Sequence, residues 1–190
     1  MSLGLFTVDV HGHLWFDIDC HLSNPTWFFP KHFVFNRDSG LSRILLLHTA
    51  YLLHVHNAAV ELLNLGPVNS AQQVAEDIQE VIKALPCGEH AFARVVGQGT
   101  NGWEYYELSL DGLSGPHTAQ PDQLYGVGVG WENARSAWEA SSELSPCQRL
   151  RAALQAAAYV QLEVVVPQTR QPARIDRCVK PWAYPSELLS

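Results

Sequence analysis

The sequence predicts an α+β fold: a single domain with a mostly antiparallel sheet and two pairs of helices packed on it. The chain has 190 residues, a length that fits one domain with a substantial core. A period-two alternation runs from Phe6 to Leu22 and is typical of strands. Segments with helical patterning come in two pairs, which favours an α+β arrangement over a parallel sheet with alternating helices. The expected order is ββααβββααβ, with residues 1–166 as the domain and residues 167–190 as an irregular tail packed on it.

The composition excludes several classes of function. The chain is 47% hydrophobic and 16% charged, and its formal net charge is −7. Because affinity for phosphate backbones comes mainly from clustered Lys and Arg, we expect no nucleic-acid partner and no anionic membrane surface. The four cysteines lie far apart without a CxxC pair, which indicates reduced thiols. The sequence shows no signal-like segment and no uninterrupted apolar run of membrane-spanning length, so we expect a cytoplasmic protein.

The N-terminal segment alternates between an apolar and a polar face. Even-numbered residues from Phe6 onward are apolar apart from Gly12, whereas most odd-numbered residues are polar. The segment forms either one long bent strand or two strands joined near Gly12. A second extended run spans Trp27 to Phe35, and Pro30 marks it as an edge or bulged strand.

Two helices are expected next. The first runs from about Leu41 to Leu65, ends at a Gly-Pro pair, and is apolar on most sides, as a central buried helix would be. The second runs from Ala71 to Leu85. Ser70 is its expected N-cap, and Gln73 three residues later completes the capping-box pattern.

Three strands follow in the prediction. Residues 91–96 and 103–110 form a hairpin around a loop that contains Asn101 and Gly102. Residues 113–122 are a loop by composition. Residues 123–131 form a third strand, and three of its glycines share one face, where they permit close approach of an aromatic side chain or of backbone: Gly126, Gly128 and Gly130.

A second helix pair and a final strand complete the predicted fold. One helix spans about Glu132 to Ser142. The other opens at Ser145 and Pro146, an N-cap followed by a proline in the first turn, and runs to about Ala158. Residues 159–167 form the last strand. The tail from Gln168 contains three prolines and is expected to be irregular.

The stretch from Val8 to Leu14 holds a candidate metal site. His11 and His13 are two residues apart, so on a strand they point to one face, and Asp9 could be a third ligand or orient an imidazole. The motif resembles the opening of metal-dependent amidohydrolases and TatD-like nucleases, and this resemblance implies His11 and His13 as metal ligands. The chain departs from those families because it is short for their barrel and its elements do not alternate. The alternative is the polar face of an amphipathic strand.

The first predicted helix carries a polar stripe that offers candidate proton-transfer groups. His54 and His56 diverge on a helix and cannot chelate one ion, whereas His54, Asn57 and Glu61 share one face. His54 and Glu61 are therefore the catalytic candidates if the chain is an enzyme. The alternative is a solvated or hydrogen-bonded helix face.

Aromatic residues set among acidic ones suggest a protein interface. Several large aromatic side chains fall at positions that are otherwise polar, a composition typical of binding surfaces. The alternative is ordinary packing in the core. The candidate partner-binding residues are Trp15, Asp17, Asp19, Trp103 and Tyr105.

These observations lead to one expected function and two alternatives. We expect a non-catalytic, acidic cytoplasmic protein without a cofactor that binds another protein, as an inhibitor or immunity-type partner of a basic surface, because opposite charge speeds encounter. The first alternative is a metal-dependent hydrolase that uses Asp9, His11 and His13 with a divalent metal such as zinc, and His54 or Glu61 nearby. The second is a small-ligand pocket between the central helix and the first strands.

Overall fold

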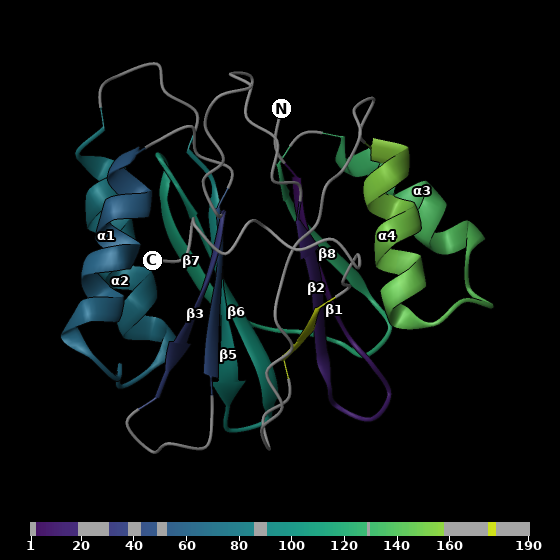
Figure 1. The fold of residues 1–190 in the computed structure, drawn as a ribbon, viewed down its shortest axis with the longest axis horizontal. Coiled ribbons are helices and arrows are strands. Elements are labelled where there is room, and N and C mark those ends of the chain that lie inside the picture. Colours follow the sequence, from purple (N-terminus) through teal and green to yellow (C-terminus); the bar gives the residue numbers. More distant parts are fainter. Residues whose placement is uncertain are drawn as a thin grey trace, which may run out of the picture.

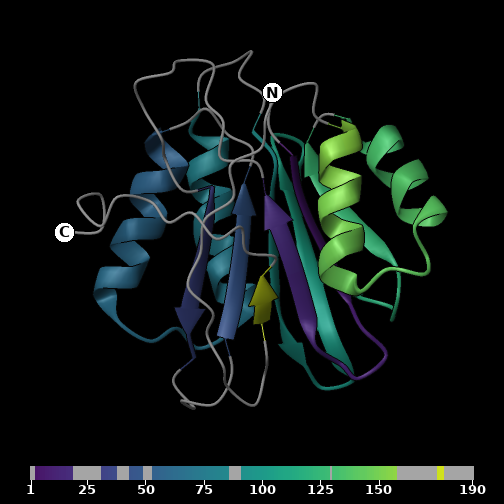
Figure 2. The same ribbon diagram turned by 45° about the vertical axis from the view of Figure 1, so that its right-hand side comes forward.

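Two sheets lie face to face in this protein, and each carries a pair of helices on its outer side (Figure 1). The computed structural model describes residues 3–18, 31–37, 43–48, 53–85, 91–128, 130–157 and 175–177. These residues form one α+β domain of four layers, helices, sheet, sheet and helices, as Figure 2 shows from a second direction. The fold class expected from the sequence is confirmed, with the sheet divided into two.

The strands are ordered as follows. The first sheet has the order β8-β1-β2-β9, and the second has the order β3-β4-β5-β6-β7. Neighbouring strands are antiparallel except β2 and β9, which are parallel. The bounds in the first sheet are Leu124–Gly128 for β8, Leu3–Val8 for β1, Leu14–Ile18 for β2 and Ile175–Arg177 for β9. In the second sheet they are His32–Asn36 for β3, Arg43–His48 for β4, Ala93–Gly99 for β5, Gly102–Ser109 for β6 and Gly112–Thr118 for β7.

The helices cover the outer faces of the two sheets. Helices α1 and α2 lie against the second sheet, and α3 and α4 lie against the first (Figure 1). Their bounds are Leu53–Leu65 for α1, Ala71–Lys83 for α2, Trp131–Ala140 for α3 and Pro146–Ala157 for α4. Among the described residues, no helix is long and apolar enough to cross a membrane.

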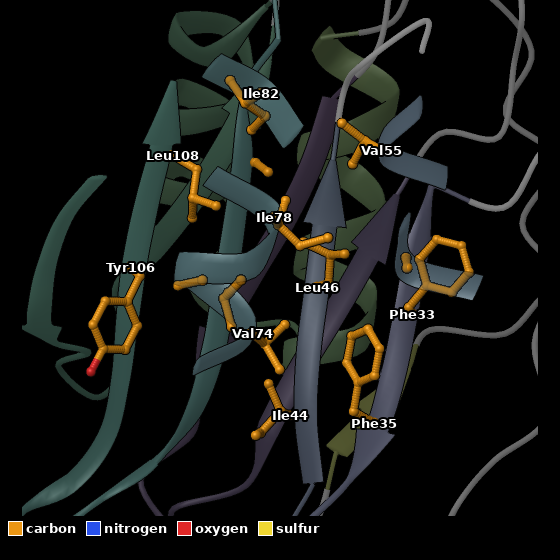
Figure 3. Close-up of a cluster of buried hydrophobic side chains, with 14 of the residues drawn as sticks. Phe33, Phe35, Ile44, Leu46, Val55, Val74, Ile78, Ile82, Tyr106 and Leu108 are labelled. Carbon is orange, nitrogen blue, oxygen red and sulfur yellow. The ribbon is translucent and has the colours of Figure 1, made fainter. Parts of the chain in front are cut away.

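Three hydrophobic cores separate the four layers. The core under α1 and α2 is shown in Figure 3, where Ile44 and Leu46 of β4 meet Val74 and Ile78 of α2. A second core lies between the sheets and includes Phe6, Phe16, Leu45 and Leu47. A third lies under α3 and α4 and includes Leu3, Leu5, Leu150 and Leu154. The central strands are thus buried on both faces, and burying one such side chain fully contributes about 1.5–3 kcal/mol.

The burial of both faces explains why β4 was predicted wrongly. Residues 43–48 form a strand, whereas the sequence predicted the start of a helix there. Ile44 and Leu46 face the helices, while Leu45 and Leu47 face the first sheet, so the strand is a continuous apolar run without a period of two. Among the described residues, the helix spans Leu53–Leu65.

Two other segments differ from the prediction because they carry no apolar pattern. Residues 112–118 form the edge strand β7, where a loop was predicted, and most of its side chains are exposed. Residues 175–177 form β9 beside β2, where an irregular tail was predicted. The predicted strand over residues 159–167 lies outside the described residues.

Several local predictions are confirmed. The Ser70 hydroxyl caps α2 by accepting a hydrogen bond from the backbone N–H of Gln73 at 3.1 Å. The predicted hairpin forms, but Gly99 lies opposite Gly102, so the two loop residues are Thr100 and Asn101. The strand with three glycines forms as β8, although it ends at Gly128.

The glycines of this segment do permit close approach, as the sequence predicted. A Cβ at Gly126 would lie 2.6 Å from the ring of Trp131, and one at Gly130 would lie 2.9 Å from the carbonyl oxygen of Ala157. Gly130 also has a φ of +93°, a conformation that favours glycine. Gly126 therefore lets Trp131 of α3 lie against β8, and Gly130 lets the start of α3 approach the end of α4.

We expect the substitution Gly126→Ala to lower the free energy of unfolding by about 1–3 kcal/mol, because the added methyl group must displace Trp131 or Leu5. Urea denaturation followed by circular dichroism measures this loss. The matched control places Gly126→Ala in a Trp131→Leu background, where the smaller side chain makes the same methyl group less costly. An equal loss in both backgrounds would contradict the proposed contact.

Candidate functional site

The stretch with the candidate metal ligands is the turn between β1 and β2. The chain reverses at Gly12, whose φ is +78°, and the two strands pair with Val8 opposite Leu14. The N–H of Gly12 donates to the carbonyl oxygen of Asp9 at 3.0 Å, and the N–H of Asp9 donates to the carbonyl oxygen of His13 at 2.9 Å. Of the two arrangements left open by the sequence, two strands joined near Gly12 is the one that forms.

The Asp9 carboxylate organises this turn. Its Oδ1 atom accepts hydrogen bonds from the backbone N–H groups of His11 at 2.9 Å and His13 at 2.8 Å. Its Oδ2 atom accepts one from the indole N–H of Trp15 at 2.9 Å and lies 3.1 Å from Nδ1 of His13. Both carboxylate oxygens are thus engaged within the turn, which favours a structural role for Asp9.

The same contacts determine the acidity of Asp9. Partial burial is the largest single influence and raises the pKa, but the hydrogen bonds from Trp15, His13 and His11 and the charge of His13 together outweigh it. The pKa of Asp9 therefore lies below its ordinary value of 3.8. The folded protein stabilises the ionised form of this carboxyl group.

The three expected metal ligands are close in sequence and partly close in space. The imidazole rings of His11 and His13 lie with centroids 6.1 Å apart, and Asp9 contacts only that of His13. Among the described residues, no group of three His, Cys, Asp or Glu side chains is arranged to hold a metal ion. A metal at this turn stays a prediction, and an ion would have to displace the donors that now hold Asp9.

The candidate proton-transfer groups lie on another part of the molecule. His54 and Glu61 are both exposed on α1, which packs on the outer face of the second sheet. The turn with Asp9 belongs to the first sheet, and both views place it away from α1 (Figures 1 and 2). The structure therefore does not bring His54 or Glu61 to the candidate metal ligands.

The expected partner-binding residues separate into buried and accessible ones. Trp103 is buried between the sheets, and its indole N–H donates to the carbonyl oxygen of Gly12 at 2.8 Å. Asp17 is fully buried on β2. Trp15 is half-buried against the core under α3 and α4, and Tyr105 is half-buried on β6. Asp19 lies outside the described residues. Burial removes Trp103 and Asp17 from any docking surface in this conformation.

Three buried ionisable side chains lie at or next to the ends of β2, β3 and β4. Asp17 is 0% exposed, Lys31 1% and His48 2%. The N–H of His48 donates to the carbonyl oxygen of Lys31 at 2.9 Å, and the rings of Phe16 and His32 lie 5.4 Å apart, so the segments that carry these groups meet. Asp and Lys are almost never fully buried unless they are paired, which makes these residues candidate site residues.

A groove of about 830 Å³ lies at the edge of the first sheet that β8 forms. It is lined by residues of β5, β6, β8, α3 and α4, and its aromatic side chains include Tyr105, Tyr125 and Trp131. The rings of Tyr105 and Tyr125 lie 4.9 Å apart. The guanidinium of Arg94 lies 5.4 Å from the centre of the Tyr105 ring. Burial raises the pKa of Tyr105, and this effect outweighs the opposing charge of Arg94.

An arginine on α4 fixes one wall of this groove. Arg149 is buried, its guanidinium lies 3.7 Å from the centre of the Trp138 ring, and Nη2 donates to the carbonyl oxygen of Trp138 at 3.1 Å. Nη1 forms an ion pair with Asp122, which precedes β8 and has a φ of 60°. Arg149 thus ties α3 and α4 to the turn that leads into β8.

Sequence reasoning found Tyr105 but missed the groove and the burial of the ionisable residues. Arg94 and Glu107 lie directly opposite each other on β5 and β6, but this pairing depends on a loop at Thr100 and Asn101 that the sequence did not specify. Lys31 lay inside the predicted extended run from Trp27 to Phe35, and His48 lay inside the predicted helix from Leu41 to Leu65. A search for charged residues inside apolar strands would have selected Asp17, the one signal that was available.

Comparison with known proteins shows which solved structures share this fold. No protein-family model and no curated protein sequence matches this chain. Among solved structures, it matches Anbu (ancestral beta-subunit) from Yersinia bercovieri with a TM-score of 0.57 and 17% identity, over 81% of this chain and 72% of that one. The chain has an Anbu-like fold. Because the identity is low, the likeness is one of fold alone.

Two further Anbu structures support the match. Anbu from Hyphomicrobium sp. strain MC1 matches with a TM-score of 0.60 and 13% identity, over 88% of this chain and 79% of that one. The Anbu complex from Pseudomonas aeruginosa, described as a helical assembly, matches with a TM-score of 0.62 and 16% identity, over 92% of this chain and 84% of that one. The Anbu-like fold therefore extends over most of the chain.

We expect Asp9→Asn to lower the free energy of unfolding at neutral pH by about 1–3 kcal/mol, because an amide accepts fewer of the four contacts. The lowered pKa of Asp9 means that its ionised form stabilises the fold above the ordinary value of 3.8. This contribution is lost as pH falls through the folded-state pKa, so the difference between the two proteins shrinks in acid.

Urea denaturation at a series of pH values measures this difference. The control is Asp111→Asn, which changes an exposed aspartate in the turn between β6 and β7 and is expected to have little effect. If Asp9→Asn is as stable as the parent at neutral pH, the carboxylate does not organise the turn.

Proposed function

We propose that this chain is a subunit of an assembly built from several copies of itself. The observation that carries the proposal is the Anbu-like fold over 92% of the chain, shared with a Pseudomonas aeruginosa protein that forms a helical assembly. The partner expected from the sequence is then a second copy rather than a separate basic protein. The inhibitor or immunity-type role stays the alternative prediction.

The surface of α1 supports self-association. Its outer face exposes apolar side chains beside the polar stripe, with Val60 36%, Leu63 40% and Leu65 84% exposed. The polar stripe on this helix, including His54 and Glu61, supplies hydrogen-bonding groups around them. An apolar centre with a polar rim is the usual composition of a protein interface. We propose that α1 contributes to contacts between copies.

We expect the purified chain to form particles larger than a monomer, and the double substitution of Leu63 and Leu65 to Ser to raise the subunit dissociation constant at least about tenfold. Two leucines buried at an interface contribute more than the ~1.4 kcal/mol to which tenfold corresponds. Sedimentation velocity over a wide range of protein concentration gives the measurement.

The matched control is Leu144→Ser, which removes a similarly exposed leucine from the turn between α3 and α4. A parent chain that stays monomeric at every concentration would overturn the proposed function. A chain that assembles equally well with both leucines replaced would remove α1 from the interface. A salt-sensitive complex with a different, basic protein would instead support the inhibitor role.

A second candidate function, hydrolysis of an amide or ester, is favoured by the burial of Asp17, Lys31 and His48. A lysine held away from water can exchange a proton with a reacting group. Both side chains are fully buried, Asp17 near the end of β2 and Lys31 next to the start of β3. We propose Lys31 as the proton-transfer group and Asp17 as the residue that positions it.

Fluorogenic peptide amides and acyl esters test this second candidate. We expect Lys31→Met and Asp17→Asn each to lower the rate by about 10²–10⁴-fold, the usual contribution of a proton-transfer group. Lys31→Arg keeps the charge but cannot transfer a proton at neutral pH, so it should fold and still lose activity. Lys83→Met, at an exposed position on α2, is the control. An inactive parent chain or an active Lys31→Arg variant would reject the candidate.

A further inference from the structure

The outer edge of β8 is unpaired among the described residues. β8 is the first strand in its sheet and pairs only with β1 there, with Gly126 opposite Leu5 and Tyr125 opposite Phe6. Every second residue of an edge strand turns its N–H and C=O groups away from its neighbour. β8 therefore presents backbone donors and acceptors that an extended chain can bind.

The groove of about 830 Å³ runs along this same edge. Residues 123–126 and Gly128 line it, so the strand itself forms part of the wall. Gly126 and Gly128 carry no side chain, and Trp131 fills the space that a side chain of Gly126 would take. Edge and groove are thus one site, with backbone groups along its length and side chains on either side.

The pleat of β8 divides the groove into two sides. Tyr125 shares a face with Phe6, whose ring stacks on it at 5.0 Å, and this face looks toward Arg94 and Tyr105 of the second sheet. Gly126 shares the other face with Leu5, and there Trp131 of α3 lies against the strand. Alternate side chains of an added strand would therefore enter two different environments.

The charges that line the groove are already paired with one another. Arg94 and Glu107 are 2.5 Å apart, Arg135 and Glu139 are 3.0 Å apart, and Arg149 pairs with Asp122. These six residues supply all the charges in the lining. A charged ligand group would have to break one of these pairs, whereas an uncharged side chain would pack on the aromatic rings.

We propose that this groove binds an extended peptide segment with uncharged, aromatic or aliphatic side chains, which joins the first sheet as a strand beside β8. The backbone of β8 provides affinity, and the two sides of the groove select alternate side chains. The site is held in shape before binding by the contacts of Arg149 with Asp122 and Trp138. The inference does not depend on self-assembly or on hydrolysis.

The probe for the first test is the peptide acetyl-Thr-Tyr-Ser-Phe-Thr-amide, titrated into the isotope-labelled protein and followed by NMR. We expect the amide signals of residues 124–128 to shift and one alternate set of them to become protected from hydrogen exchange. Two N-methylated versions of the probe, each blocking alternate N–H groups, provide a matched pair. One should bind at least about tenfold more weakly and the other nearly as well, because only one set faces β8.

The second test changes the charge of one wall. Glu107→Gln leaves Arg94 without its carboxylate partner. The altered probe has Glu in place of Tyr, and its carboxylate can then pair with Arg94. We expect the variant to bind this altered probe at least about tenfold more tightly than the parent protein does. Glu104→Gln changes a neighbouring carboxylate on the opposite face of β6, outside the lining, and should leave both affinities unchanged.

Three results would overturn the proposal. The first is equal binding of both N-methylated probes. The second is probe-induced shifts that are confined to residues outside the groove. The third is full protection of every amide of residues 124–128 in the peptide-free protein, which would mean that the edge is already paired. Sedimentation velocity on the same samples shows whether the chain assembles. If the chain is a monomer that binds the probe, self-assembly is rejected and the peptide site is retained. If the chain assembles but does not bind the probe, the peptide site is rejected and self-assembly is retained.

Discussion

The burial of the central strands on both faces is the constraint on which the rest of the structure depends. Strands β1 and β4 place alternate side chains in two cores, so neither sheet can move without opening both. This packing fixes where the strand ends and strand edges lie. Asp17 and Lys31 lie at or next to strand ends, and the groove lies at an edge. The packing of the two sheets, and not a local sequence motif, therefore determines where both candidate sites lie.

Patterns along the sequence predicted the elements that alternate between apolar and polar residues or carry a specific cap. Ser70 predicted the start of α2, and the alternation around Gly12 predicted the two strands that now form a hairpin. The same reasoning failed for β4, where burial on both faces erases the period of two, and for β7, where exposure leaves no apolar pattern. The division into two sheets depends on contacts between distant segments, which no local pattern specifies.

The candidate sites show the same limit. The motif of Asp9, His11 and His13 looked like a set of metal ligands, but a turn needs the same residue types when a carboxylate caps backbone N–H groups. Trp103 and Asp17 were predicted as interface residues because they fall at positions where the sequence pattern is polar. The structure buries both side chains. Tyr105 was selected for its chemistry, and the structure gives it a place in the groove.

Native-state hydrogen exchange, read residue by residue, tests the doubly buried sandwich most directly. We expect amides of β1, β4 and β5 to exchange only through global unfolding, because each strand lies between two neighbours and two packed faces. We expect the exposed edge strand β7 to exchange through smaller openings. Rapid exchange in β1 or β4 at neutral pH, with β7 protected, would contradict the two-sheet arrangement from which both candidate sites follow.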